Sequence, residues 1–176
     1  QAQGESMRSS HPIRIATNLS GRHFGQTEIL ELVKKALNYY QADPASIIFE
    51  VTETAAVENM TEAQNFMLAL RKLGCQFALD DFGTGVCSYA YLKSLPVDYL
   101  KIDGHFVSDL LKDPLNKAII ESIVHIAKVM QIQTIAEWVE SDEILDELKK
   151  MGVNYIQGYH IGIPEALPGQ ISTQSF

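Results

Sequence analysis

Two adjacent aspartates, Asp80 and Asp81, are the residues of this chain whose type and spacing most clearly indicate chemistry. They follow the apolar run 77–79 and precede a glycine-rich turn at 83–85. Carboxylates this close together repel each other unless a positive charge lies between them. The glycines let the backbone turn sharply and approach a ligand closely. We therefore expect a divalent metal site at the end of a strand.

Oxygen donors at the ends of other expected strands extend this site. Mg²⁺ and Mn²⁺ prefer oxygen ligands, and the five histidines of the chain show no zinc spacing. Two such ions about 4 Å apart that share Asp80 would activate a water and hold a phosphoryl group in line for attack, which is the chemistry of phosphodiester hydrolysis. The expected cofactors are therefore two Mg²⁺ or Mn²⁺ ions, and the expected ligands are Asn18, Glu50, Asp80 and Asp81.

Three residues at strand ends are candidates for handling the reacting groups. Lys101 is placed to stabilise charge in the transition state or to orient the attacking water. Glu137 is a candidate metal ligand or proton acceptor, and Gln157 is a candidate to hold the water. Each has a plainer interpretation, because acidic residues at strand ends often cap helices and Lys101 has Asp103 nearby as an ion-pair partner.

Three neighbouring residues each have two interpretations. Glu53 is either an anchor for the glycine turn or a surface residue. Glu140 is either a surface residue or a cap or support for the metal ligands. Trp138 either stacks on a nucleobase or packs at the mouth of the site. The chain contains no dinucleotide-binding or Walker pattern, and no serine or cysteine nucleophile with a partnered histidine stands out.

The bulk properties narrow the class of protein. The 176 residues are enough for one domain, and a hydrophobic content of 46% suits a globular enzyme or binding module. A net charge of -8 argues against binding to a DNA or RNA polymer. Cys75 and Cys87 lack ligand spacing and fit reduced thiols. With no signal peptide or membrane-spanning run, we expect a cytoplasmic location, although further domains could anchor the parent protein to a membrane.

Short apolar runs alternate with helix-length amphipathic segments along the chain. Strands are expected at 13–17, 47–49, 77–79, 99–103, 133–136 and 155–159. Helices are expected at 27–41, 61–73, 89–94, 114–130 and between Ser141 and Gly152, with Thr61 and Ser141 as N-caps. The domain is expected to span 13–164, after a polar segment at 1–12 and before a loose tail at 165–176.

This alternation favours a parallel sheet with right-handed crossovers. An open doubly wound sheet gathers its site at one switch point, whereas a barrel brings every strand end to one mouth. Polar candidates accompany all six expected strands, so we expect an α/β fold of the TIM-like (β/α) barrel type. Such barrels have about eight strands, and the missing N-terminal strands are expected upstream of this sequence.

Several short motifs occur in a fixed order along the chain. They are Asn18-Leu19-Ser20, Glu50-Val51-Thr52-Glu53, Asp80 to Gly85, Tyr91-Leu92-Lys93, Leu95-Pro96-Val97-Asp98, Lys101-Ile102-Asp103, Ala136-Glu137-Trp138-Val139-Glu140 and Gln157-Gly158-Tyr159. In identity and order this series resembles the EAL-domain cyclic di-GMP phosphodiesterases. The resemblance covers nearly everything from Ile13 to Pro164.

The resemblance implies a barrel that hydrolyses cyclic di-GMP to linear pGpG in bacterial second-messenger signalling. It implies two Mg²⁺ or Mn²⁺ ions, with Lys101 and Glu137 at the centre where metal and water meet and Gln157 in contact with it. By the same resemblance Glu53 holds the turn 81–85, which couples metal binding to dimerisation, and Glu140 belongs to the supporting residues. The implied partners are cyclic di-GMP, a second copy in a homodimer through the glycine-turn side, and upstream sensor or cyclase domains.

The sequence departs from the family pattern at several positions. The Glu-Ala-Leu motif, which supplies a metal ligand, does not occur and is expected before Gln1. Trp138 replaces the usual Gly, Val86-Cys87 replaces an aromatic and small pair, Gly104-His105 stands where Arg-Ser is common, and Ile161-Gly162-Ile163 replaces Phe-Ser-Arg. We expect these changes to affect substrate affinity more than metal binding.

Three functions are compatible with these features. We favour an active phosphodiesterase, because the metal-binding and water-handling residues visible in the sequence are intact. The alternatives are a catalytically inactive EAL-type receptor or interaction module for cyclic di-GMP, and an unrelated metal-dependent barrel hydrolase. The 176 residues alone are expected to be weakly stable or inactive, because an open barrel wall exposes sheet edges.

Overall fold

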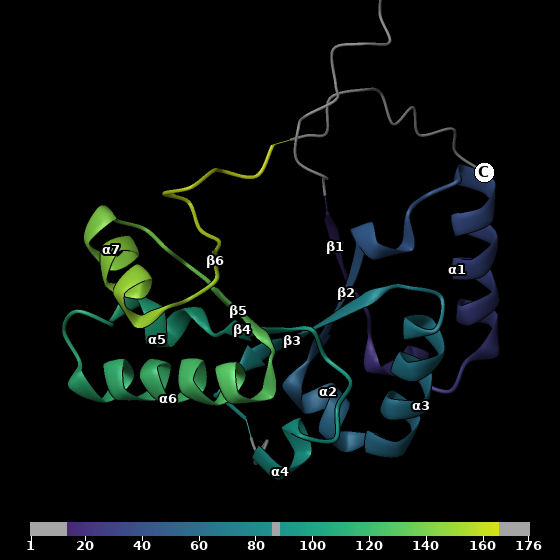
Figure 1. The fold of residues 1–176 in the computed structure, drawn as a ribbon, viewed down its shortest axis with the longest axis horizontal. Coiled ribbons are helices and arrows are strands. Elements are labelled where there is room, and N and C mark those ends of the chain that lie inside the picture. Colours follow the sequence, from purple (N-terminus) through teal and green to yellow (C-terminus); the bar gives the residue numbers. More distant parts are fainter. Residues whose placement is uncertain (1–13, 86–88, 166–176) are drawn as a thin grey trace, which may run out of the picture.

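The structure of the chain, a computed structural model, describes residues 14–85 and 89–165. Six parallel strands form one sheet in the order β1-β2-β3-β4-β5-β6, and helices connect them (Figure 1). The strand order never reverses, so the sheet has no switch point of the kind that open doubly wound sheets use. The structure therefore confirms the expected barrel type and shows a half-barrel of six strands.

The strands and helices follow one another in a regular alternation. The strands are β1 (Ile15–Asn18), β2 (Ile47–Thr52), β3 (Gln76–Phe82), β4 (Tyr99–Ile102), β5 (Gln133–Ala136) and β6 (Tyr155–Ile156). The helices are η1 (Gly21–His23), α1 (Thr27–Tyr40), η2 (Pro44–Ser46), α2 (Glu53–Glu58), α3 (Met60–Arg71), α4 (Tyr89–Leu92), α5 (Gly104–Ser108), α6 (Pro114–Met130) and α7 (Asp142–Met151). Within the described ranges, no helix combines the length and the apolar character needed to cross a bilayer.

Most expected elements are present, with differences at their ends. Helix α3 begins at Met60 with Asn59 as its N-cap, so the expected cap Thr61 is wrong. Ser141 does cap α7, where its side chain accepts a hydrogen bond from the Ile144 amide. The short helices α2 and α5 were not expected, because six and five residues are too few to show an amphipathic period.

Some expectations concern residues that the structure does not describe. The polar segment 1–12, Val86, Cys87 and the tail from 166 onward lie outside the described ranges. Cys75 lies within them and is a buried free thiol, as its lack of ligand spacing indicated.

Successive side chains along each strand point to opposite faces of the sheet. One face packs against the helices and carries the main core, which includes the fully buried Phe77, Leu79 and Leu100. The opposite face carries a small apolar cluster of Ile48, Ala78 and Tyr99, with Ile135 packed against it. Because successive side chains on a strand point to opposite faces, the residues two positions further along each strand also point to this second face. That second layer contains the charged residues described below.

The opposite ends of the strands, where the chain enters the sheet, are fastened by polar side chains. Asp98, just before β4, accepts a hydrogen bond at Oδ2 from the Phe77 amide at 2.9 Å, and its Oδ1 lies 3.1 Å from the Arg71 guanidinium at the end of α3. Asn154, just before β6, accepts from the Thr134 amide at 2.8 Å, and the Asn154 amide donates to Thr134 Oγ1 at 3.2 Å. These contacts hold the register of neighbouring strands.

Replacing Asp98 by Ala is expected to destabilise the domain. The amide of the buried Phe77 would lose its acceptor, which costs about 1–3 kcal/mol. Urea unfolding should show this loss in the free energy of unfolding. The control is Asp109→Ala, which removes an exposed pair with Lys112 at 3.5 Å and should change stability by less than about 0.5 kcal/mol. Equal effects of the two substitutions would contradict the role given to Asp98.

Candidate functional site

A buried lysine surrounded by three carboxylates forms the centre of the candidate site. Lys101 in β4 is 3% exposed. Its Nζ lies 2.8 Å from Asp80 Oδ1, 2.8 Å from Glu137 Oε1 and 3.3 Å from Glu50 Oε2. Each of these four charged residues lies two positions after a residue of the small apolar cluster described above. Four neighbouring strands therefore place one layer of charged side chains at the C-terminal end of the sheet.

The pKa values of Lys101 and Glu137 are shifted by burial and by hydrogen bonds within this layer. Burial alone would lower the pKa of Lys101, but hydrogen bonds to Asp80 and Glu137 outweigh it and raise that pKa above its usual range. Burial raises the pKa of Glu137, although Lys101 opposes this shift. Lys101 is therefore a fixed positive charge at the centre of the layer.

A β-bulge explains how two adjacent aspartates reach the same site. Leu79 pairs with Leu100 and Phe82 pairs with Ile102, so β3 carries one extra residue over this stretch. Asp81 has a positive φ of 55°. In a regular strand Asp80 and Asp81 would point to opposite faces, but a bulge redirects a side chain and bends the strand.

The redirected carboxylate completes a candidate metal centre. One carboxylate oxygen from each of Asp80, Asp81 and Glu137 lies within 4.8 Å of the others. Partial burial raises the pKa of Asp81, and the neighbouring charge of Asp80 adds to the shift; a bound cation would oppose both effects. Hard oxygen donors at this spacing fit Mg²⁺ or Mn²⁺.

Glu53 contacts the glycine turn, which is one of the two interpretations that the sequence left open. It is buried at the start of α2, and its Oε2 accepts a hydrogen bond from the Gly83 amide at 2.9 Å. Gly83 has a φ of 103°, a backbone conformation that glycine adopts without strain. The turn that follows Asp81 is therefore fixed by a buried carboxylate from the neighbouring strand connection.

The remaining predicted residues lie around this centre. Asn18 is exposed at the end of β1 and pairs in register with Glu50. Gln157, directly after β6, donates its amide to the Ala136 carbonyl at 2.8 Å. Gln157 and Glu140 both line a pocket of about 480 Å³, beside Trp138. The structure thus gathers Glu50, Asp80, Asp81, Lys101 and Glu137, and places Gln157 and Glu140 in the adjoining pocket.

One alternative from the sequence is wrong, and one feature was missed. Lys101 does not form its ion pairs with Asp103, because Asp103 Oδ1 accepts from the His105 amide at 2.8 Å and contacts His105 Nδ1 at 2.7 Å. The bulge at Asp80 and Asp81 was not anticipated. The adjacent carboxylates were its one signal, since a regular strand would separate them.

Several known proteins are similar to this chain in sequence. The family model of the EAL domain matches residues 1–164. The chain is 46% identical to the cyclic di-GMP phosphodiesterase PdeB of Shewanella oneidensis over 153 residues, and this aligned stretch covers 87% of this chain and 18% of PdeB. It is 42% identical to the cyclic di-GMP phosphodiesterase PdeF of Escherichia coli over 154 residues, a stretch that covers 88% of this chain and 21% of PdeF. The chain spans about a fifth of the length of these relatives.

Solved structures share the fold. The PaMucR phosphodiesterase in complex with c-di-GMP is similar with a TM-score of 0.81 at 34% identity, over 86% of this chain and 61% of that one. The FimX EAL domain from Pseudomonas aeruginosa bound to c-di-GMP is similar with a TM-score of 0.82 at 30% identity, over 88% and 64%. The first of these is named a phosphodiesterase and the second an EAL domain, and both have the barrel-type fold found here.

Replacing Lys101 by Met is expected to destabilise the charged layer. Three mostly buried carboxylates would lose their shared cation, and leaving such charges unpaired costs about 3–5 kcal/mol. The measurement is the free energy of unfolding in EDTA and again with excess Mg²⁺, which should recover part of the loss by binding the carboxylates. Lys112→Met, at an exposed ion pair, is the control. A Lys101→Met variant as stable in EDTA as the parent would contradict this account.

Proposed function

The chain belongs to the EAL domain family, and on that basis we propose that it forms part of a domain, residues 13–164 in this sequence, that hydrolyses cyclic di-GMP to linear pGpG. The observation that carries the proposal is the layer in which Lys101 contacts Glu50, Asp80 and Glu137. The names of the relatives supply the substrate and the reaction.

Each residue has a proposed role that its position supports. Asn18, Glu50, Asp80 and Asp81 are the proposed ligands of two Mg²⁺ or Mn²⁺ ions, with Glu137 beside them. When bound, the ions would activate a water and neutralise charge on the phosphoryl oxygens. Lys101 orients Asp80 and Glu137 through its hydrogen bonds, and its fixed positive charge would help to stabilise negative charge on a bound phosphoryl group. Gln157 is assigned to orient the water.

The test is turnover by the complete protein that carries this chain. With Mg²⁺ or Mn²⁺, cyclic di-GMP should be converted to pGpG, which chromatography and mass spectrometry identify, and EDTA should abolish the reaction. Asp80→Asn should lower kcat about 100-fold or more, because a charged ligand at the reacting centre is lost. Asp109→Asn, at an exposed position after α5, should leave kcat unchanged.

The outcomes separate the candidate functions. Binding of cyclic di-GMP without turnover would support the receptor alternative instead. Turnover that persists in EDTA would contradict the metal-dependent mechanism. Failure to bind or cleave cyclic di-GMP would overturn the proposed substrate.

The glycine turn is proposed to link the metal site to a homodimer interface. The turn is exposed at residues 83–85 and is fastened to Glu53. Glu53 therefore transmits any displacement of Asp81 to a surface that a second copy would contact. The dimer itself rests on the family resemblance.

Substitutions of Glu53 should separate its hydrogen bond from its charge. Glu53→Ala leaves the Gly83 amide without this acceptor, and we expect kcat to fall at least about 10-fold because Asp81 is less firmly placed. Glu53→Gln keeps an acceptor oxygen and should retain more activity than Glu53→Ala. Equal activity in the two variants would show that the hydrogen bond to the turn has no catalytic effect.

A further inference from the structure

Trp138 presents a large aromatic surface directly beside the candidate catalytic centre. It is 49% exposed, although it follows the half-buried Glu137 in the chain. It lines the pocket of about 480 Å³ together with Gln157 and Tyr159. The rest of the lining comes from Glu140, Gly158, Gly162 and Pro164. An aromatic residue that served the core alone would be buried, so its exposure in a pocket has to be explained.

The backbone and two neighbours hold the indole in this position. Trp138 has a φ of 53°, in the left-handed region that bulky residues rarely adopt. Its ring lies 4.8 Å from the His105 ring, centroid to centroid, at 52°. A Cβ built on Gly104 would overlap the indole, so the absence of a side chain at 104 makes room for it. Strained backbone of this kind concentrates at sites of function.

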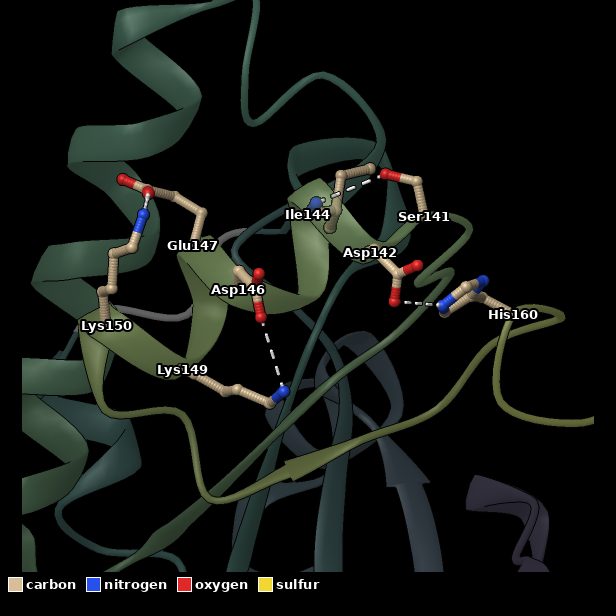
Figure 2. Close-up of polar contacts among 8 residues, drawn as sticks. All are labelled: Ser141, Asp142, Ile144, Asp146, Glu147, Lys149, Lys150 and His160. Carbon is tan, nitrogen blue, oxygen red and sulfur yellow. Dashed lines mark hydrogen bonds and ion pairs between the residues drawn. The ribbon is translucent and has the colours of Figure 1, made fainter.

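The segment after β6, which supplies part of the pocket lining, is fastened to the start of α7. His160 Nε2 lies 3.0 Å from Asp142 Oδ1, as Figure 2 shows, and the His160 amide donates to the Val139 carbonyl at 3.1 Å. The Val139 amide in turn donates to the Gln157 carbonyl at 3.0 Å. The segment after β6 is thus bonded to the backbone next to Trp138, and both segments line the pocket.

The pocket adjoins the place where the phosphodiester would be cut. Glu137 contacts Lys101, and Trp138 is the next residue, about 3.8 Å further along the backbone. A base attached through its ribose to a phosphate held at Lys101 would therefore lie near the indole. A flat purine and an exposed indole have complementary shapes, and stacking of this kind is a common way of binding a base.

We propose that Trp138 is a substrate-binding residue that stacks on one guanine base of cyclic di-GMP. This inference rests on the proposed function, since it assumes that substrate. It adds that the indole, positioned by Gly104 and His105, contributes to affinity rather than to chemistry. The substitution should therefore change KM or Kd more than kcat.

The test compares variants of Trp138 in the complete protein. Trp138→Ala and Trp138→Leu should raise KM for cyclic di-GMP about 5- to 150-fold, with a smaller change in kcat. Trp138→Phe keeps a ring and should lie between these variants and the parent. Tyr39→Ala, which removes an aromatic residue that is 81% exposed on α1, should leave KM unchanged.

A packing role predicts a different result. Trp138→Gly removes the indole and also relieves the positive φ, so we expect its Tm to be unchanged or higher while KM rises. A fall in Tm with no change in KM would show that Trp138 only packs, and would overturn the inference.

Substitution of Gly104 provides an independent test of how the indole is positioned. Gly104→Ala should displace the indole and raise KM in the parent, but should add little in the Trp138→Ala background, because the two substitutions remove the same contact. If the effects of the two substitutions on KM were fully additive, Gly104 would not act by positioning the indole. If the parent turns over cyclic di-GMP and all Trp138 variants keep its KM, this inference fails while the proposed function stands. If the parent neither binds nor cleaves cyclic di-GMP, both fail.

Discussion

A buried ammonium group shared by three carboxylates is the constraint on which the site depends. Lys101 cannot be buried unless its charge is matched, and Glu50, Asp80 and Glu137 cannot converge unless a cation lies between them. These four residues come from four neighbouring regions of the sheet. Their mutual requirement therefore fixes the relative register of β2 to β5 at the functional end, in addition to the backbone hydrogen bonds.

The strands divide two tasks between their two ends. Where the chain enters the sheet, Asp98 and Asn154 bond to backbone amides and hold neighbouring strands together. Where the strands end, the carboxylates of Glu50, Asp80 and Glu137 instead converge on Lys101. The apolar layer of Ile48, Ala78 and Tyr99 lies between these ends, and Lys101 is buried two residues beyond Tyr99. A barrel sheet thus supports a charged site without that site having to stabilise the fold alone.

The order of elements and most site residues could be predicted from the sequence, because apolar periodicity and polar residues after strands are local signals. Other features depend on three-dimensional contacts. The bulge at Asp80 and Asp81 depends on pairing with β4, and the choice of Lys101 partners depends on three other strands. Asp103 was the nearest carboxylate in sequence, yet it binds His105. Short helices such as α2 and α5 follow from capping and chain direction, for which periodicity gives no signal.

Two departures from the family pattern are explained by one structural exchange. Gly104 stands where Arg is common, and Trp138 stands where Gly is usual. In this chain the indole occupies the space next to residue 104, so a side chain at 104 and an indole at 138 exclude each other. Compared with the family pattern, the large side chain follows β5 instead of β4, and it is aromatic instead of charged. The pocket beside Trp138 thus presents an aromatic surface, and stacking on such a surface depends less on salt concentration than an ionic contact does.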